Sequence, residues 1–141
     1  MRFEIPEKKK LVYQMTIPVR WGDMDTMGHV NNALYFRYME SARINWLHSI
    51  NCLPDPQGEG VILASTFCNF RRPFVYPADI LIKTYVTEPG HSSFETWTTM
   101  EKVGEPGVLY ATGGATLVWL NFREGKSMPL PEWLRQVLTT R

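Results

Sequence analysis

The chain has 141 residues, of which 44% are hydrophobic and 21% are charged, and its formal net charge at pH 7 is +1. Single domains typically span roughly 100–150 residues, so we interpret residues 1–141 as one domain with one core. The near-neutral charge argues against a nucleic-acid-binding surface.

Several features favour a cytoplasmic protein that binds no nucleic acid and no membrane. No apolar run approaches the roughly 20 residues of a membrane span, and the N-terminal MRFEIPEKKK lacks the hydrophobic stretch of a signal peptide. We interpret the run Lys8, Lys9 and Lys10 as a solvated arm. Cys52 and Cys68 lack the spacing of a zinc site, so we expect two reduced thiols, no metal and no cofactor.

The chain begins with a predicted strand that leads into an acidic turn. Residues 11–21, LVYQMTIPVRW, are rich in β-prone side chains and predict the strand. The turn carries two carboxylates, Asp23 and Asp25, with glycines at positions 22 and 28 around them. This turn concentrates carboxylates where the next element begins.

One long helix is predicted over residues 31–50, with Asn31 or Asn32 as its N-cap. Apolar side chains recur at helical spacing on one broad face, and others interrupt the polar side. We therefore expect this helix to be largely buried.

After a loop rich in Pro and Gly at residues 51–60, the hydrophobic period changes from helical to two, which is typical of strands. The last strand carries Gly113 and Gly114, which indicate a bulge or a close approach by another backbone or by a ligand. A short terminal helix is predicted over residues 129–140. The four predicted strands are residues 61–70, 80–87, 93–102 and 108–122. This element order predicts an α+β fold, in which an antiparallel sheet of about five strands wraps around one long central helix.

The segment DMDTMGHVNN, residues 23–32, stands between a strand and a long helix, and it resembles the hotdog-fold acyl-CoA thioesterases of the hydroxybenzoyl-CoA thioesterase type. The resemblance implies hydrolysis of an acyl-CoA to a free acid and CoA. It implies that Asp25 is the catalytic general base or nucleophile and that the backbone N–H of Asn32 polarises the thioester carbonyl. It also implies a homodimer, or a tetramer of such dimers, whose sheets join edge to edge.

Other readings of the same segment stay open. His29 and Asn32 stand where the hydroxybenzoyl-CoA enzymes carry apolar and aromatic residues, so the resemblance does not extend to their aromatic substrate. The HVNN run also resembles plant-type acyl-acyl-carrier-protein thioesterases, in which Asp25 and His29 would match functional positions and Met27 would replace an Asn. A non-catalytic acyl-CoA-binding protein on this fold is a further alternative. A hotdog enoyl-CoA hydratase is disfavoured by the spacing of Asp25 and His29.

Thioester hydrolysis needs a group that activates water or attacks directly, together with donors for the developing oxyanion. Asp25 before a helix provides the first, and the unpaired N–H groups of the helix start provide the second. The alternative role of Asp25 is an Asx-turn or helix-entry cap. We interpret Asp23 as structural, and His29 as either a contact to the thioester or carboxylate or a packed side chain.

Further residues are predicted to bind the substrate. Arg71 and Arg72 follow a strand end, where they would hold the phosphates of CoA or serve only solubility. Glu40, on the long helix, is a reserve carboxylate, although an ion pair with Arg37 or Arg43 explains it more simply. Aromatic residues and methionines of this region line an acyl pocket or belong to the core or dimer interface. The substrate-binding candidates are Gly28, Tyr35, Arg71, Arg72, Ser92 and Ser93, and the aromatic and Met set is Trp21, Met24, Met27, Tyr35, Tyr38 and Met39.

Overall fold

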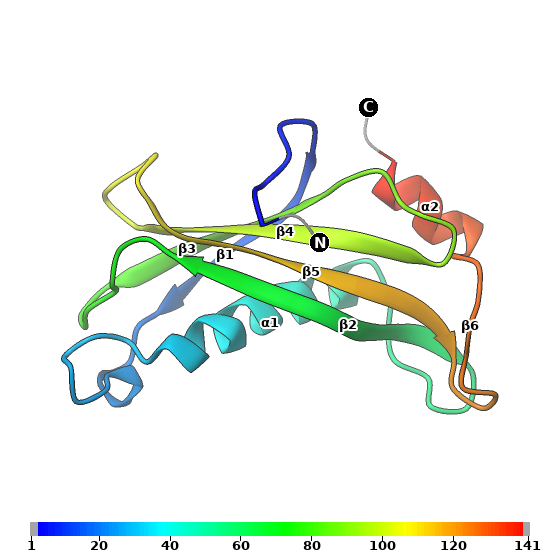
Figure 1. The fold of residues 1–141 in the computed structure, drawn as a ribbon, viewed down its shortest axis with the longest axis horizontal. Helices are drawn as coiled ribbons and strands as arrows, with labels where there is room; N and C mark the ends of the chain where they lie inside the picture. Colours follow the sequence, from blue (N-terminus) through cyan, green and yellow to red (C-terminus); the bar gives the residue numbers. More distant parts are fainter. Residues whose placement is uncertain (1–2, 140–141) are drawn as a thin grey trace.

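A computed structural model describes residues 3–139. Its strands form one antiparallel sheet in the order β1-β3-β4-β5-β2, with β6 paired to β5, and the long helix α1 lies along one face of this sheet (Figure 1). The strands are β1 Lys10–Pro18, β2 Glu59–Phe70, β3 Asp79–Val86, β4 Ser93–Lys102, β5 Leu109–Asn121 and β6 Lys126–Ser127. The helices are a 3₁₀ turn Trp21–Asp23, α1 Asn32–Ser49 and α2 Glu132–Leu138.

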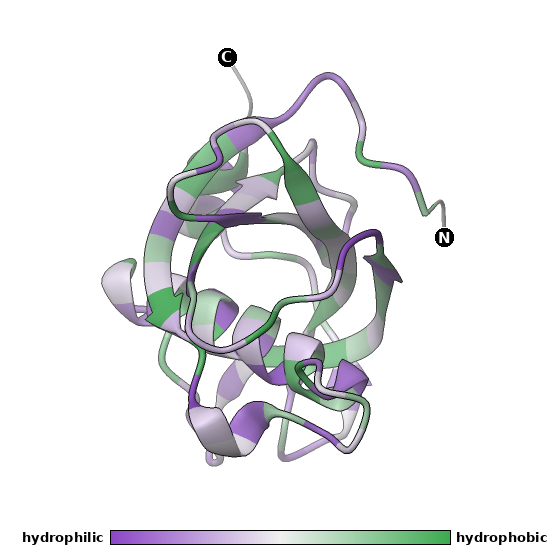
Figure 2. Ribbon diagram, turned by 90° about the vertical axis from the view of Figure 1, so that its left-hand side faces the viewer, coloured by the Kyte–Doolittle hydropathy of each residue, from purple (hydrophilic) through white to green (hydrophobic). Residues whose placement is uncertain are grey.

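This architecture confirms the predicted α+β hotdog fold. Figure 2 views the molecule at right angles to Figure 1 and shows how strongly the sheet curls, with α1 against it. The sheet has six strands rather than about five, because β6 is a two-residue strand too short to leave a period in the sequence. The terminal helix is also shorter than predicted, and residue 140 of that prediction lies outside the described residues.

The first strand ends at Pro18 rather than at Trp21, which corrects the predicted boundary. Pro18 has no backbone N–H to donate to a neighbouring strand. Beyond it the chain turns into the 3₁₀ helix, in which Asp23 N–H donates to the carbonyl of Arg20 at 2.9 Å. The acidic turn therefore begins earlier than the β-prone residues suggested.

Helix α1 begins at Asn32, and the side chain of Asn31 caps it by accepting from the Ala33 N–H at 2.9 Å. The helix is not buried nearly all round, as its sequence suggested, because Phe36 is 37% exposed and Ile44 is 46% exposed. A single sheet covers one side of a helix only. The side of α1 that faces away from the sheet therefore remains exposed to solvent, where another subunit could cover it. The residues buried on α1 are Tyr35, Tyr38, Met39, Ala42, Arg43, Trp46 and Leu47.

The glycine pair in β5 reflects close packing rather than a bulge. The pairing of β5 with β2 and β4 is continuous at Gly113 and Gly114, and the register shifts lie elsewhere. A Cβ on Gly113 would collide with the sulfur of Met39 and would lie 2.8 Å from the carbonyl oxygen of Phe67. This glycine therefore lets α1 approach the centre of the sheet.

Two lysines of the N-terminal run are tied to the fold, which contradicts their interpretation as a solvated arm. The Lys9 ammonium lies 5.1 Å from the centre of the Tyr85 ring. Lys10 Nζ donates to the carbonyl of Val137 at 3.0 Å, so the first strand is joined to the last helix. Within residues 3–139, no helix is long and apolar enough to cross a membrane.

Candidate active site

Asp23 fixes the acidic turn against the helix. Its Oδ2 atom accepts a hydrogen bond from the backbone N–H of Arg20 at 2.9 Å and another from the hydroxyl of Tyr38 at 2.7 Å. Its backbone carbonyl accepts from the N–H of Asn31 at 2.9 Å. One residue thus connects the end of β1, the turn and α1, which agrees with the structural role predicted for it.

Asp25 lies exposed in the middle of this turn. Its Oδ1 atom accepts from the N–H of Met27 at 2.9 Å, which is the Asx-turn geometry that the sequence left open. The turn closes through the N–H of Asp25 to the carbonyl of His29 at 2.8 Å, and Gly28 adopts a φ of 79° that favours glycine. Among the described residues, the Oδ2 atom of Asp25 accepts no hydrogen bond. One oxygen of this carboxylate therefore remains available to a water or a substrate.

The start of α1 supplies an unpaired hydrogen-bond donor, a few residues after Asp25 in the sequence. Asn31 uses its side chain to cap Ala33, and the carbonyl of Asn31 accepts from the N–H of Leu34 at 2.9 Å. The backbone N–H of Asn32, the first helical residue, has no acceptor among the described residues. Such N–H groups at a helix N-terminus carry partial positive charge and suit an oxyanion.

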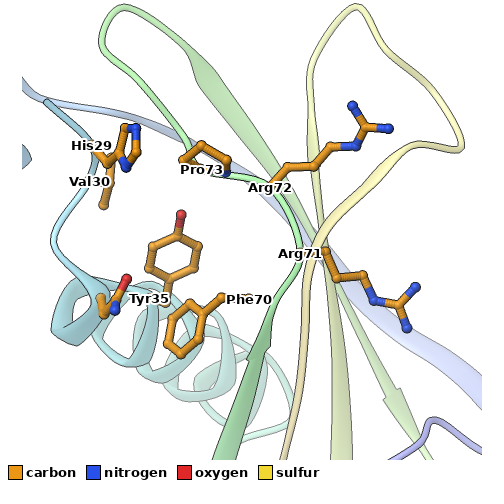
Figure 3. A pocket seen from close by; sticks show the side chains of 8 residues that line it. His29, Val30, Tyr35, Phe70, Arg71, Arg72 and Pro73 are labelled. Atoms are coloured by element: carbon orange, nitrogen blue, oxygen red, sulfur yellow. The ribbon is translucent and has the colours of Figure 1, made fainter. Parts of the chain in front are cut away.

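Asn32 lines a pocket of about 200 Å³, which we call the cationic pocket and which Figure 3 shows from close by. In Figure 3, Tyr35 points its hydroxyl towards the middle of the group, and both arginines extend their guanidinium groups away from it. The residues that line the cationic pocket are His29, Val30, Asn32, Tyr35, Phe70, Arg71, Arg72 and Pro73.

Tyr35 is the buried polar group of the cationic pocket. Its hydroxyl oxygen accepts from the N–H of Phe74 at 3.2 Å, so its proton remains available for donation. Burial raises the pKa of Tyr35 above its ordinary value of 10.0, although the N–H of Phe74 acts in the opposite direction. This side chain therefore stays a neutral donor at physiological pH.

A second and larger concavity, of about 770 Å³, is lined by other residues of the turn, and we call it the aromatic cleft. Asp25 lines this cleft and not the cationic pocket. The N–H of Tyr76 donates to the sulfur of Met24 at 3.4 Å, which connects the two segments that wall the cleft. The residues that line the aromatic cleft are Trp21, Gly22, Met24, Asp25, Thr26, Gly28 and Tyr76.

The predicted site residues thus fall into three groups. The first group lines the cationic pocket and includes His29. The second group lines the aromatic cleft and includes Gly28, so the two groups adjoin at consecutive residues of the chain. Ser92 and Ser93 form the third group. Ser93 pairs with Val118 of β5, whereas Phe70 pairs with Ala111. At about 3.4 Å per strand residue, these positions lie roughly 24 Å apart. The roles of both serines as contacts to CoA stay predictions.

Sequence reasoning identified Arg71 and Arg72 after β2, but it missed the last residue of β2 and the rest of the loop between β2 and β3. Phe70 and Pro73 line the cationic pocket, and Tyr76 lines the aromatic cleft. An aromatic residue in a proline-containing loop was the available signal, but nothing local indicates which distant turn such a loop approaches. The contact is made by the Val30 N–H, which donates to the carbonyl of Phe74 at 2.9 Å.

Glu40 and the two cysteines line neither concavity. Glu40 lies 4.0 Å from Arg37 in an exposed contact, which is the simpler account given for it. Cys52 and Cys68 are unpaired thiols, and burial raises the pKa of Cys68 to about 12. Cys68 therefore remains a thiol rather than a thiolate nucleophile. No group of three His, Cys, Asp or Glu within residues 3–139 is arranged to hold a metal ion.

Comparisons with known proteins show the family and the fold of this chain. The family model of the thioesterase-like superfamily matches residues 19–138. The PA2801 protein of Pseudomonas aeruginosa, a candidate thioesterase, is 35% identical with a TM-score of 0.85, over 90% of this chain and 98% of that one. A candidate acyl-CoA thioesterase from Xanthomonas campestris is 38% identical with a TM-score of 0.71, over 78% and 93% of the two chains. The uncharacterized YsmA of Bacillus subtilis (strain 168) is 26% identical over 114 residues, which are 79% of this chain and 75% of YsmA.

Proposed function

Because the chain belongs to the thioesterase-like superfamily, we propose that this thioester hydrolase cleaves an acyl-CoA to a carboxylic acid and CoA, with Asp25 as general base or nucleophile. The observation that carries the proposal is that the acidic turn and the helix start after it each carry a polar group without a hydrogen-bond partner among the described residues. Asp25 has an oxygen without a hydrogen bond, and the Asn32 N–H has no acceptor among the described residues. The similarity to a candidate acyl-CoA thioesterase at 38% identity supports CoA as the carrier.

The proposed reaction needs only these groups and water. The thioester carbonyl oxygen binds at the Asn32 N–H, which stabilises the negative charge that develops on it. As a base, Asp25 takes a proton from the water that attacks the carbonyl carbon. As a nucleophile, it bonds to that carbon, and water then hydrolyses the resulting anhydride. In both cases the C–S bond breaks and CoA leaves as a thiolate. Its thiol pKa, near the roughly 8.5 of free cysteine, makes strong acid assistance unnecessary.

The cationic pocket fits the CoA side of the substrate. Arg71 and Arg72 are exposed, and they supply the positive charge that phosphates require. Tyr35 offers its hydroxyl proton, and His29 lines the same pocket, which supports contacts from both to the thioester region. These contacts would orient the carbonyl rather than perform the chemical step.

We further propose that the active form is a homodimer joined along β2. This strand lies at one end of the sheet order, so one of its edges has no partner strand among residues 3–139. Ile62 and Leu63 on β2 are 38% and 45% exposed, and Phe36 and Ile44 on α1 are also exposed. An unpaired apolar edge beside an open helix face is the surface that a second copy would cover.

The test is thiol release from a panel of acyl-CoAs, measured for the native protein and for Asp25→Asn. Loss of a catalytic base or nucleophile is expected to lower kcat by about 10²-fold to 10⁴-fold. Asp55→Asn is the matched control, because Asp55 makes the same kind of turn contact, accepting from the Gln57 N–H at 3.0 Å, outside both concavities. Equal activity of the two variants would overturn the role of Asp25. If the protein releases thiol only from acyl carrier protein thioesters, then acyl carrier protein and not CoA carries the acyl group.

A further inference from the structure

We propose that Arg43 of each protomer forms an ion pair with Glu40 of a second copy of this chain, so that the middle of α1 is part of the dimer interface. The inference rests on the homodimer of the proposed function. It adds a second contact surface, on the helix rather than on the edge of β2, and it names the charged residues that make this surface complementary to itself.

The first observation is that Arg43 is a buried cation without an acceptor. The residue is 8% exposed, and its guanidinium makes no hydrogen bond or ion pair with any residue that the structure describes. Burial lowers the pKa of Arg43, although the charge of Glu40 acts in the opposite direction. Arginine nevertheless stays protonated in proteins, and removal of an unpaired charge from water is strongly unfavourable. Arg43 therefore needs an acceptor from outside its own chain.

The nitrogen atoms of Arg43 can still be reached from outside. The fully enclosed side-chain atoms that lack a hydrogen-bond partner, among the described residues, belong to Thr84, Trp97 and Thr99. The guanidinium nitrogens are not among them, so they keep a narrow opening to the surface. A carboxylate from another molecule can enter there without displacing a contact that Arg43 already makes.

Arg43 lies on the flank of α1 that faces the proposed dimer edge. On the opposite flank, the side-chain amide of Asn45 donates to the sulfur of Met15 at 3.5 Å, so that flank faces β1. Positions two residues apart on a helix point roughly 200° away from each other, which directs Arg43 away from β1. Strands β1 and β2 are the two ends of the sheet order, so Arg43 is on the β2 side.

The second observation is that an acceptor without a strong partner lies one helical turn before Arg43. The side chain of Glu40 is 54% exposed, and its contact is a separation of 4.0 Å from Arg37, whose side chain is 72% exposed. Exposed pairs of this kind contribute little to stability. Glu40 and Arg43 form no ion pair within the chain, although they are three residues apart. An unpaired cation and a weakly paired anion therefore lie side by side on one helix.

Two-fold symmetry pairs these groups between copies. In an isologous interface, a contact from residue i to residue j occurs again from j to i. If two antiparallel α1 helices are related by an axis that crosses between Ser41 and Ala42, position 40 of each copy lies opposite position 43 of the other. That axis is within a residue of the middle of α1, which spans Asn32–Ser49. Both charges are then paired, and the ion pair forms twice.

The surroundings of the pair favour its formation. Phe36, one turn before Glu40, is 37% exposed, and Ile44, next to Arg43, is 46% exposed. Such exposed apolar side chains on a helix are typical of a surface that another protein covers. When a second copy covers them, water is excluded from the ion pair, and the attraction between its charges increases.

The test measures the dissociation constant of the dimer by sedimentation equilibrium for Arg43→Glu and for Glu40→Arg. Each variant alone brings like charges together at both contacts, so the dissociation constant is expected to rise at least about 100-fold. An equimolar mixture of the two variants pairs an acidic helix with a basic one and restores both contacts. We expect this mixture to form heterodimers, detected by native mass spectrometry. An ion pair within one chain could not produce this result, because each variant keeps like charges at positions 40 and 43 of its own chain.

Arg37→Glu is the control, because it reverses a charge that contacts Glu40 outside the proposed pair, and it should change the dissociation constant less than about 3-fold. Glu40→Arg changes an exposed residue, so it decides the question even if Arg43→Glu does not fold. A Glu40→Arg dimer as tight as the native one, or a mixture that stays monomeric, would overturn the inference.

The outcomes also separate this inference from the proposals on which it rests. A native protein that is monomeric overturns it together with the proposed homodimer. A native dimer that is dissociated by a charge on β2, as in Leu63→Lys, but not by Glu40→Arg overturns this inference alone. Neither measurement uses turnover, so a failure of the proposed hydrolysis at Asp25 would leave the ion pair standing.

Discussion

The hydroxyl of Tyr38 donates a 2.7 Å hydrogen bond to Oδ2 of Asp23, and this bond joins the buried face of α1 to the turn that carries Asp25. Tyr38 is 5% exposed. Burial raises the pKa of Tyr38, and the bond to Asp23 raises it further, so the hydroxyl keeps its proton and remains a donor. The position of Asp25, the carboxylate proposed to be catalytic, therefore depends on a helix residue that lines neither the cationic pocket nor the aromatic cleft.

Tyr38→Phe removes this bond and keeps the ring. We expect the free energy of unfolding to fall by about 1–3 kcal/mol, since the bond joins a buried donor to a carboxylate. We also expect kcat to fall with little change in KM, because the turn shifts while the CoA contacts remain. Thermal unfolding and steady-state kinetics measure both effects. Asp23→Asn, whose amide oxygen still accepts from Tyr38 and Arg20, should lose less stability and less activity than Tyr38→Phe. An equal or greater loss would contradict the idea that this bond acts by positioning the turn.

Asn32→Pro tests the backbone donor directly. Proline is well tolerated at the first helical position, and Asn31, with φ −57° and ψ 133°, already has the backbone that precedes a proline. The substitution removes the N–H proposed to bind the oxyanion, so kcat is expected to fall about 10²-fold to 10³-fold with unchanged helix content by circular dichroism. Asn32→Ala keeps the N–H and should retain most activity. Full activity of the proline variant would exclude this donor.

Gly113→Ala places a methyl group against the Met39 sulfur and the Phe67 carbonyl. The carbonyl belongs to a paired strand and has little room to move, so we expect the free energy of unfolding to fall by about 1–3 kcal/mol. Gly22→Ala is the matched control, because its Cβ meets nothing within 4 Å, and it should change stability by less than about 1 kcal/mol. Urea denaturation of both variants makes the comparison, and similar values would refute close packing at Gly113.

Leu63→Lys places a charge on the unpaired edge of the sheet. If β2 joins two copies, this variant is expected to be monomeric by light scattering at concentrations where the native protein is dimeric. Val103→Lys, at a residue that is 51% exposed and lies just beyond the end of β4, serves as the control and should leave the assembly unchanged. A native protein that is already monomeric would rule out the proposed dimer.

Stability should fall at alkaline pH. Burial raises the pKa of Cys68 from 9.0 to about 12, so between these values the unfolded chain has released this proton and the folded chain has not. The unfolded state then binds fewer protons, and the free energy of unfolding decreases as pH rises. The contribution is complete below pH 9 and is lost progressively towards pH 12. Urea denaturation at pH 8 and pH 11 should show a smaller decrease for Cys68→Ala than for the native protein, and an unchanged decrease would locate the effect in other groups.

The sequence predicted the features that depend on local period. It placed α1 to within a residue and limited its N-cap to Asn31 or Asn32, of which Asn31 is the cap, because helical spacing and capping chemistry are both local. It did not predict that Phe36 and Ile44 are exposed, because that depends on how many layers cover the helix. It also could not place Tyr76 beside Asp25. That neighbourhood is created by a hydrogen bond between Val30 and Phe74, which are far apart in the chain and share no pattern.

The order of strands in the sheet has a consequence for synthesis on the ribosome. β2 ends at Phe70, but its neighbour in the sheet is β5, which begins only at Leu109. At a translation rate of about 5–20 residues per second, β2 emerges roughly 2–8 s before the strand that it pairs with. During that interval Ile62 and Leu63 are carried on a strand with neither edge paired, so the nascent chain is most prone to aggregation before β5 has been made.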